Sequence, residues 1–499
     1  MDSKLQKRTD CNKENSLKSK PNIILVEPPA VSPFGNQRIF GGNGSNKSDF
    51  RKPPLDLMMI SGYLRKEGFD NTLIDANASR RTIDEVKETL RNISPDVIFF
   101  STSTCTIYKD LLIAKVAKEI NPSAITVAIG THVMALPEET FKESQYLDVI
   151  IYSSEWEQAS LNIIKNISNL SQANGIFFRK YNGEIVKTGY QLPIENLDVL
   201  GFPSHDKLEK VLYGDPTSKR FPKTMVMGQK SCSNNCSFCC QPAFFGAPGI
   251  RARSVEHFLE ELLWVQKLGF KEVMFNDATL TADMKWAASL FEGMMRNNIN
   301  LTWNCSTRAD RVNAEILKLM KSAGCHTIAI GMESVDPLVL KNIRKGITAE
   351  KIRETVSLIK KCGMDTIVFC VVGFPGETRE SIEKTIVFLK TLDTTFITLG
   401  IAVPAPGTDF YRHVEENKYL LTKDWSLYDP MKKPVFSYPW LSSDEIVYYS
   451  RYGLRQFYLR PKYILDRIKT IRSFSEAASY FSNFLGFMKR YVLEQGTKR

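Results

Sequence analysis

Four of the ten cysteines in this 499-residue chain fall within nine positions, in the stretch KSCSNNCSFCC at residues 230–240. Cys232, Cys236 and Cys239 have the spacing C-x3-C-x2-C, and thiolates are soft ligands that suit zinc or iron–sulfur clusters. A structural zinc site usually takes four ligands as two distant pairs, yet the sequence has no second C-x2-C and no H-x3-H. Cys240 directly follows Cys239, and adjacent cysteines rarely reach one metal in good geometry. Three cysteines on one loop favour a 4Fe–4S cluster with one iron left open to an external ligand.

The cysteine loop lies within a region, residues 223–415, in which apolar runs alternate with helical patterns. The six apolar runs are KTMVMG, EVMFND, LTWNCST, TIAIGMES, TIVFCVVG and FITLGIAVPAP. Six strand–helix units in succession predict a partial (β/α)6 barrel. The cysteine loop follows the first strand, and reactive residues of such barrels lie at the carboxyl ends of the strands. Four other cysteines in or beside the strands are expected to be small buried residues: Cys305, Cys325, Cys362 and Cys370.

The region before the barrel predicts a second α/β domain. Residues 21–170 contain five apolar strand runs alternating with helices, which predicts a doubly wound, flavodoxin-like parallel sheet. Residues 171–222 are expected to form a linker with a hairpin, closed by a type I′ turn at Asn182-Gly183. Residues 1–20 are polar and predict a disordered tail, and residues 416–499 predict a helical, basic C-terminal region.

The composition argues against a membrane-spanning or exported chain. No run approaches the roughly 18 apolar residues that a spanning helix needs. The polar N-terminus lacks the apolar stretch of a signal peptide, so we expect a cytoplasmic protein, in which structural disulfides are rare.

The cysteine spacing after the first strand of a partial barrel resembles the signature of the radical SAM superfamily. The preceding doubly wound domain, with its stretches LIDANA, PDVIFFSTST and IGTHVMALPEE, resembles the cobalamin-binding domain fused to many of these enzymes. Related groups include hopanoid methylases, tetraether-lipid ring synthases and anaerobic Mg-protoporphyrin ester cyclases. The resemblance implies that a 4Fe–4S cluster binds S-adenosylmethionine and cleaves it reductively to a 5′-deoxyadenosyl radical, which attacks an unactivated carbon. It also implies an electron donor such as ferredoxin or flavodoxin.

Polar and glycine residues after the barrel strands are the candidates for holding S-adenosylmethionine. The resemblance implies that Phe238 packs near the adenine, that Asp277 pairs with the methionine ammonium, and that Arg308 holds the methionine carboxylate by a two-pronged contact. The full candidate set is Phe238, Asn276, Asp277, Arg308, Glu333, Ser334, Gly373 and Gly376. Read alone, Asp277 and Glu333 could equally cap the following helices, and Arg308 could form a structural ion pair.

The candidate cobalamin residues follow strands of the first domain, at Ser101, Thr102, Ser103, Gly130 and His132. The family's Asp-x-His-x-x-Gly motif, which supplies a histidine to cobalt, is absent, and His132 lacks the accompanying aspartate. The stretch SSEWE at 153–157 also departs from the family's Gly-Glu-Gly-Glu. Cobalamin bound without a protein histidine ligand, and a domain that has lost its cofactor, both stay open.

The C-terminal region carries much of the chain's positive charge. The formal net charge is +11, and residues 451–499 contain eleven Lys or Arg against three Asp or Glu. Aromatic residues lie among these basic residues, which permits RNA binding, contact with an anionic membrane surface, or a helical cap on the barrel. Because similar tails occur in relatives with lipid or tetrapyrrole substrates, the resemblance favours a small hydrophobic substrate and peripheral contact with the inner face of the membrane. Nucleic acid is not expected, and the rival class is a non-enzymatic, zinc-stabilised nucleic-acid-binding protein.

Overall fold

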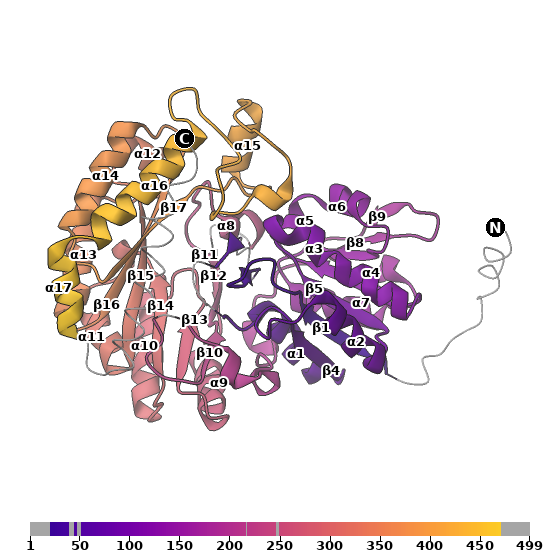
Figure 1. Ribbon diagram of the computed structural model, residues 1–499. Coiled ribbons are helices and arrows are strands. Elements are labelled where there is room, and N and C mark those ends of the chain that lie inside the picture. The colour runs from indigo at the N-terminus through magenta and orange to yellow at the C-terminus, as the bar shows by residue number, and fades with distance from the viewer. Residues whose placement is uncertain (1–19, 39–43, 47–50, 216, 246–248, 471–499) are drawn as a thin grey trace, which may run out of the picture.

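The structure is a computed structural model that describes residues 20–38, 44–46, 51–215, 217–245 and 249–470. Figure 1 shows two α/β domains side by side, with the C-terminal helices along the outer side of the second domain. No helix in these ranges combines the length and the apolar character needed to cross a bilayer. Residues 1–19 of the predicted tail and residues 471–499 of the predicted C-terminal region lie outside the described ranges.

The first domain is built on a sheet whose parallel strands have the order β4-β1-β5-β6-β7. This order, 2-1-3-4-5 along the chain, is that of a flavodoxin-like doubly wound sheet and confirms the predicted fold class. The strands are β1 (Ile23–Glu27), β4 (Asn71–Asp75), β5 (Val97–Ser101), β6 (Ile125–Ile129) and β7 (Val149–Ile151). The helices that pack with them are α1 (Leu55–Lys66), α2 (Ile83–Ile93), α3 (Ile107–Asp110), α4 (Leu112–Ile120), α5 (Thr131–Ala135), α6 (Pro137–Glu143) and α7 (Trp156–Lys165). The short strands β2 (Asn36–Gln37) and β3 (Gly44–Ser45) pair in the loop after β1.

The predicted hairpin adds two strands to this sheet and is not an isolated linker. β8 (Ile176–Arg179) pairs antiparallel with β7, and β9 (Ile185–Lys187) pairs with β8. The expected type I′ turn at Asn182-Gly183 is wrong, because only Gly183 has a positive φ, of 87°. The amide of Gly183 donates to the Lys180 carbonyl, so the turn is followed by a left-handed glycine, as in hairpins with longer loops.

The second domain is a six-stranded parallel sheet in the order β10-β13-β14-β15-β16-β17, which confirms the partial barrel. The strands are β10 (Lys223–Val226), β13 (Glu272–Phe275), β14 (Thr302–Thr307), β15 (Cys325–Glu333), β16 (Asp365–Val372) and β17 (Phe396–Ile401). The helices between them are α9 (Val255–Lys267), α10 (Met284–Arg296), α11 (Ala314–Ser322), α12 (Pro337–Asn342), α13 (Ala349–Lys361) and α14 (Arg379–Thr391), with α15 (Asp409–Glu416) after β17. Between β10 and α9 the chain inserts a small hairpin of β11 (Gln229–Cys232) and β12 (Gly249–Ala252), with α8 (Cys240–Phe244) between the two strands.

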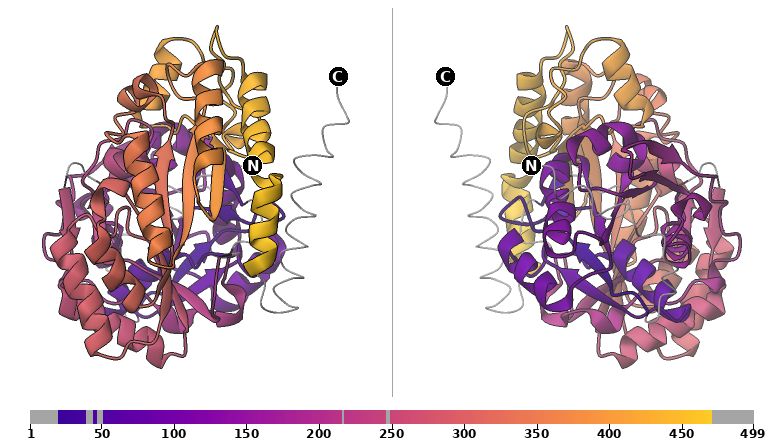
Figure 2. Two further views of the ribbon diagram at one scale, coloured as in Figure 1. Left: turned by 90° about the vertical axis from the view of Figure 1, so that its left-hand side faces the viewer. Right: turned by 90° about the vertical axis from the view of Figure 1, so that its right-hand side faces the viewer.

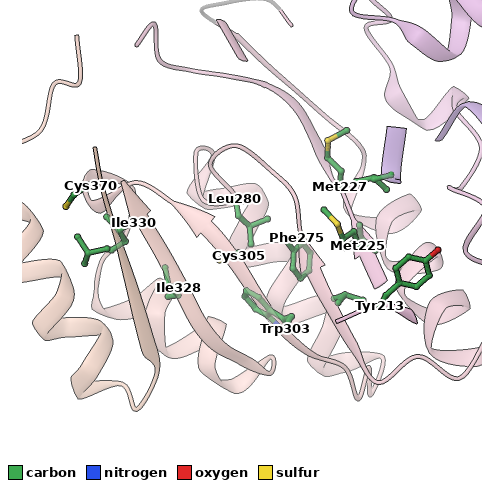
Figure 3. Packing of buried hydrophobic residues seen from close by; sticks show 14 of the residues in the cluster. Tyr213, Met225, Met227, Phe275, Leu280, Trp303, Cys305, Ile328, Ile330 and Cys370 are labelled. Atoms are coloured by element: carbon green, nitrogen blue, oxygen red, sulfur yellow. The ribbon is translucent and has the colours of Figure 1, made fainter. Parts of the chain in front are cut away.

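Buried side chains from successive barrel strands form one continuous core. Figure 3 shows Met225 from β10, Phe275 from β13, Trp303 from β14 and Ile328 from β15. All four side chains are buried. The predicted burial of Cys305, Cys325 and Cys370 is confirmed, whereas Cys362 is only partly buried.

The C-terminal region packs onto the last barrel strand. α16 (Ser443–Tyr458) begins with a capping box in which Ser442 and Glu445 bond each other's backbone amides, and α17 (Pro461–Thr470) follows it along the side of the barrel (Figure 2). Phe457 is fully buried, and the Tyr463 hydroxyl donates to the Thr395 carbonyl over 3.0 Å. The described part of the basic region therefore acts as a structural cap on the barrel.

Candidate active site

The cysteine loop lies at the carboxyl end of the barrel, where the two domains meet (Figure 1). Cys232 ends β11, and its Sγ lies 4.0 Å from the Thr279 hydroxyl that follows β13. The amide of Ser237 donates to the Ile343 carbonyl over 3.1 Å, and the Ser237 carbonyl accepts from the amide of Phe410 over 2.9 Å. These backbone bonds fix the loop against the residues after α12 and against the start of α15.

Cys240 contacts the first domain. Its thiol contacts Thr131 at the start of α5 in the first domain, and burial raises its pKa to about 11. Burial also raises the pKa of Cys239 to about 12 and that of Cys236 above its ordinary value. All four are free thiols, so the loop carries no disulfide.

The loop fits an iron–sulfur cluster by its donor set. Cys232, Cys236 and Cys239 present three soft sulfur donors from one loop, next to the cationic side chain of Lys345. In the part of the chain that the structure describes, no three His, Cys, Asp or Glu side chains are grouped closely enough to hold a metal ion. The assignment of the three cysteines therefore rests on their chemistry and their place on the barrel.

A buried ion pair lies beside Cys236. Nζ of Lys345 is 2.8 Å from Oε1 of Glu333, and both side chains are largely buried. Burial is the largest single influence on the pKa of Lys345 and lowers it, but the charges of Glu333 and Cys236 and the hydrogen bond to Glu333 together outweigh burial, so the net pKa is raised. Sequence reasoning did not single out Lys345 beside the candidate site, because Lys345 stands in a loop between α12 and α13 with no motif around it.

The Glu333 carboxylate, which was predicted to hydrogen-bond the ligand, pairs with Lys345, and the contact with S-adenosylmethionine stays a prediction. Glu333 has a φ of 69°, in the left-handed region, and the β15–β16 register shifts between Gly331 and Glu333. This strained backbone turns the carboxylate toward Lys345. Ser334 is buried, its hydroxyl contacts that of Thr385 and accepts from the amide of Asp336, and its predicted ligand contact stays a prediction.

Arg308 also has a partner within the protein. Its Nε and Nη2 donate to the two carboxylate oxygens of Asp310 over 2.9 and 3.0 Å. This contact is the structural ion pair considered as the alternative for Arg308, and its contact with the methionine carboxylate stays a prediction.

Asp277 holds the strand end that leads into the cysteine loop. It is 2% exposed, and its Oδ1 accepts from the amides of Gly228 and Gln229 over 3.2 and 2.7 Å. Burial raises its pKa to about 7. In the structure Asp277 thus positions the strand end, and its pairing with the methionine ammonium stays a prediction. The amide of Asn276 donates to the Val226 carbonyl, which ties β13 to β10 at the same end.

Phe238 and the two predicted glycines meet near the end of β16. The Phe238 ring lies 4.7 Å from the Phe374 ring, centroid to centroid. Gly373 and Gly376 have φ of 105° and 83°. A Cβ at Gly373 would lie 3.1 Å from Phe436, and one at Gly376 would lie 2.4 Å from Asn342, so close packing within the protein requires both glycines.

Glu377, next to these glycines, is expected to make the stability of the folded protein depend on pH. Its carboxylate accepts from the amides of Gly373 and Phe374, and burial raises its pKa to about 8. A group whose pKa is raised in the folded protein contributes stability below its unfolded pKa and loses it as the pH rises through the folded pKa. Between about pH 4.5 and 8 we expect Glu377→Gln to become progressively more stable than the wild type, by at most about 1.4 kcal/mol per pH unit.

Thermal unfolding at several pH values measures this difference. Glu445→Gln is the control, because the pKa of Glu445 is lowered to about 2 and the group does not titrate in this range. A difference between Glu377→Gln and the wild type that is constant with pH would contradict the raised pKa.

Buried ion pairs join the cysteine-loop hairpin to the first domain. Nζ of Lys230 lies 2.7 Å from Oε2 of Glu157, and Nη2 of Arg251 lies 2.7 Å from Oε1 of Glu155. Glu155, Glu157 and Lys230 are nearly inaccessible to solvent. The SSEWE stretch, which lacks the family's glycines, thus supplies two carboxylates that clamp the hairpin carrying Cys232.

The carboxyl ends of β1 and β5 are occupied by a second buried network. The guanidinium of Arg38 pairs with Glu27 over 3.0 Å and with Asp110 over 2.8 Å, and the Ser101 hydroxyl donates to Glu27. Thr102 donates to the Ile129 carbonyl. These groups lie at the strand-order reversal where doubly wound sheets bind ligands.

Two further predicted cobalamin residues, Ser103 and Gly130, lie at the same carboxyl edge of the sheet, after β5 and β6. The Ser103 hydroxyl bonds that of Thr106 over 2.8 Å, and Gly130 has a φ of 135° at a place where a Cβ would lie 2.4 Å from the Thr102 carbonyl. Of the five predicted residues, the three hydroxyl groups are thus already engaged within the domain.

His132 differs from them, because its Nδ1 is buried without a hydrogen-bond partner among the described residues. Burial lowers its pKa to about 3, so the ring is neutral near pH 7. Its ring lies 5.3 Å from that of Trp425 in the C-terminal region. A neutral, unpartnered imidazole nitrogen at the carboxyl edge of the sheet fits contact with a bound cofactor.

Comparison with known proteins agrees with both domains. Residues 46–159 match the B12 binding domain, and residues 227–389 match the radical SAM superfamily. The chain is 32% identical to an uncharacterized methyltransferase of Pyrococcus horikoshii over 89% of this chain and 94% of that protein. It is 26% identical to an anaerobic magnesium-protoporphyrin IX monomethyl ester cyclase of Rubrivivax gelatinosus, over 77% of this chain and 70% of that protein.

Among solved structures, the cobalamin-dependent S-adenosylmethionine radical enzyme OxsB, with aqua-cobalamin and S-adenosylmethionine bound, has the same fold. Its TM-score is 0.71 at 17% identity, and the match covers 95% of this chain and 72% of that one. These comparisons lend no support to a nucleic-acid-binding protein. The two matched domains imply a 4Fe–4S cluster, S-adenosylmethionine and cobalamin as cofactors. The chain is therefore an enzyme of the radical SAM superfamily and belongs to the group in which a B12-binding domain precedes the radical SAM barrel.

Proposed function

We propose that this enzyme methylates an unactivated carbon of a small hydrophobic substrate, such as a lipid or a tetrapyrrole-like molecule. The observation that carries the proposal is the clamp of Lys230 and Arg251 onto Glu155 and Glu157, which fixes the cysteine loop against the B12-binding domain. Such a clamp suits a reaction that uses both cofactors at one site. The similarity to a methyltransferase along nearly the whole chain supports methylation.

The protein's own groups hold and shield the cofactors. When bound, the cluster and cobalamin supply the electron and the methyl group, respectively. Cys232, Cys236 and Cys239 would hold the cluster, and Asp277 fixes the strand end from which their loop starts. Lys345 places a positive charge near Cys236, which favours the thiolate. The proposed electron donor is a small redox protein such as ferredoxin or flavodoxin.

Ring formation is the second candidate, because the chain also resembles a cyclase over 77% of its length. Mass spectrometry of lipids and pigments from cells with and without the gene separates the two. We expect the deletion to remove a product that is 14 daltons heavier than its precursor, since methylation replaces a hydrogen with a methyl group. Loss of a product two daltons lighter than its precursor would instead indicate ring closure or desaturation.

Peripheral membrane contact is proposed through the outward face of α17. Leu465 and Ile468 are 57% and 58% exposed, and Lys462 and Lys469 are exposed beside them. Exposed apolar and basic side chains on one helix suit an anionic leaflet, which attracts each Lys or Arg by about 1 kcal/mol. Phe457 and Tyr463 do not contribute, because they face the barrel.

Liposome flotation tests this contact. We expect the wild type to bind anionic liposomes less at high salt, and a double variant with Lys462→Glu and Lys469→Glu to bind several-fold less. The exposed lysines Lys285 and Lys318 of α10 and α11 provide a control double reversal with the same change in charge. Equal binding by the two double variants would argue against a membrane face on α17.

A further inference from the structure

A pocket of about 370 Å³ lies at the outer edge of the barrel, between β17 and α16. Its walls are the last three residues of β17, residues 430–433, and one face of α16. This volume is typical of small-molecule sites, which span roughly 300–1,000 Å³. None of the residues considered above as cofactor ligands lines it.

One side of the pocket is apolar. Val447 and Leu454 lie two turns apart on the same face of α16, opposite Met431 and Ile401. Between them Ser450 closes the floor, since its hydroxyl donates to the Leu399 carbonyl over 2.6 Å. A hydrocarbon chain or ring could therefore lie along α16.

The other side carries an excess of positive charge. Lys432, Lys433 and Arg451 line the pocket against a single carboxylate, Asp444. Asp444 pairs with Lys433 over 2.8 Å, and Lys432 donates to the Ser426 carbonyl. Within the described residues the guanidinium of Arg451 has no hydrogen bond or ion pair. Its planar fork of N–H donors matches a carboxylate or a phosphate.

The edge of β17 adds backbone donors. β17 is the last strand of its sheet, and the Tyr458 hydroxyl bonds the amide and the carbonyl of Ile397 at its free edge over 3.0 and 2.7 Å. In a parallel strand, alternate residues direct their N–H and C=O groups to the same edge. Ile401, four residues after Ile397, therefore turns its backbone groups toward the pocket, beyond the point where α16 caps the strand.

The pocket also lies close to the carboxyl ends of the barrel strands and to the first domain. Ile401 pairs with Val372 at the carboxyl end of β16. Pro430, in the opposite wall, contacts the first domain, because a Cβ at Gly44 would lie 2.4 Å from its ring, and the neighbouring Asp429 accepts from the Ser45 amide over 3.2 Å. A ligand here would lie beside the carboxyl ends of the barrel strands and beside the B12-binding domain.

We propose that this pocket binds the acidic group of an amphipathic substrate, a carboxylate or a phosphate, at Arg451, while the apolar part of the substrate extends along α16. The inference deepens the proposed function and rests on it for the identification of the ligand as the substrate. It narrows the substrate class from hydrophobic molecules in general to those with an anionic end.

Calorimetric titration of the full chain, reconstituted with its cofactors, tests the pocket with decanoate, decyl phosphate and 1-decanol as probes. We expect at least one acid to bind saturably at one site, more tightly than the alcohol. Arg451→Gln should weaken acid binding at least about tenfold, since hydrogen bonds to charged groups are worth about 1.5–3 kcal/mol. The preferred acid then identifies the substrate's group as carboxylate or phosphate.

Lys285→Gln is the matched control, because it removes one charge from an exposed position on α10 far from the pocket lining, and it should change binding less than twofold. If Arg451→Gln lowers the thermal midpoint strongly, Arg451→Lys takes its place, and the loss of the planar fork should still weaken binding several-fold. Equal binding of the acids and the alcohol, or equal losses in the Arg451 and Lys285 variants, would overturn the pocket proposal. Absence of 5′-deoxyadenosine from wild type incubated with S-adenosylmethionine and reductant would overturn the proposed function separately.

Discussion

Replacing Cys232, Cys236 and Cys239 together with alanine is expected to remove about four irons per chain and to abolish S-adenosylmethionine cleavage. These three sulfurs are the proposed cluster donors, whereas the thiol of Cys240 contacts Thr131 in the other domain. A 4Fe–4S cluster with one open iron needs all three. Iron and sulfide analysis after anaerobic reconstitution, with chromatographic detection of 5′-deoxyadenosine, measures both losses.

Cys240→Ala is the matched control, since it removes a neighbouring thiol and should retain both the iron and the cleavage. The outcome against the assignment is a wild type that holds one tightly bound zinc and no iron. An equal loss of iron in Cys240→Ala would mean that the fourth cysteine is also a ligand.

Replacing Lys230 with methionine is expected to destabilise the contact between the two domains by about 3–5 kcal/mol. The change leaves the carboxylate of Glu157 buried without a counter-charge and weakens the support of Glu155, which Lys230 approaches to 3.5 Å. Because Cys232 lies two residues further along the same strand, the cluster loop should lose its fixed position against the B12-binding domain. We expect the methylated product formed per 5′-deoxyadenosine to fall at least tenfold, with hydrogen exchange faster in β11 and β12.

Adding Glu157→Gln to Lys230→Met should recover part of the stability, because it removes the uncompensated charge. Lys219→Met is a suitable control, since Lys219 and Asp365 form a half-exposed ion pair worth at most about 1 kcal/mol. If Lys230→Met were no more destabilising than Lys219→Met, the buried ion pairs would not stabilise the contact between the two domains.

Both folds could be predicted, and three cysteines could be proposed as cluster ligands, because these signals are local. Strand periodicity, turn residues and the cysteine spacing all lie within short stretches of sequence. The partners of Asp277, Arg308 and Glu333 could not be predicted in this way. Position at a strand end shows that a side chain lies on the catalytic face, but not whether a backbone amide, Asp310 or Lys345 already engages it.

The contacts between the two domains could not be predicted from sequence patterns either. Glu157 and Lys230 are 73 residues apart, and each alone is typical of a solvated surface residue. Their pairing follows from the way the two sheets are docked, which periodicity does not encode. For the same reason the sequence could not show that Phe457 and Tyr463 pack against the barrel. Aromatic residues that contact a barrel and those that contact a lipid surface have the same pattern in sequence.

The left-handed backbone at Glu333 has a consequence for the evolution of this enzyme. A glycine would adopt a φ of 69° without strain, whereas a residue with a side chain carries a cost of about 1–3 kcal/mol. Glycine at position 333 would relieve that strain, but it would leave Lys345 buried without its counter-charge, which costs about 3–5 kcal/mol. The ion pair therefore outweighs the backbone strain. Libraries screened only for heat resistance should accordingly keep a carboxylate at position 333 in spite of its left-handed backbone.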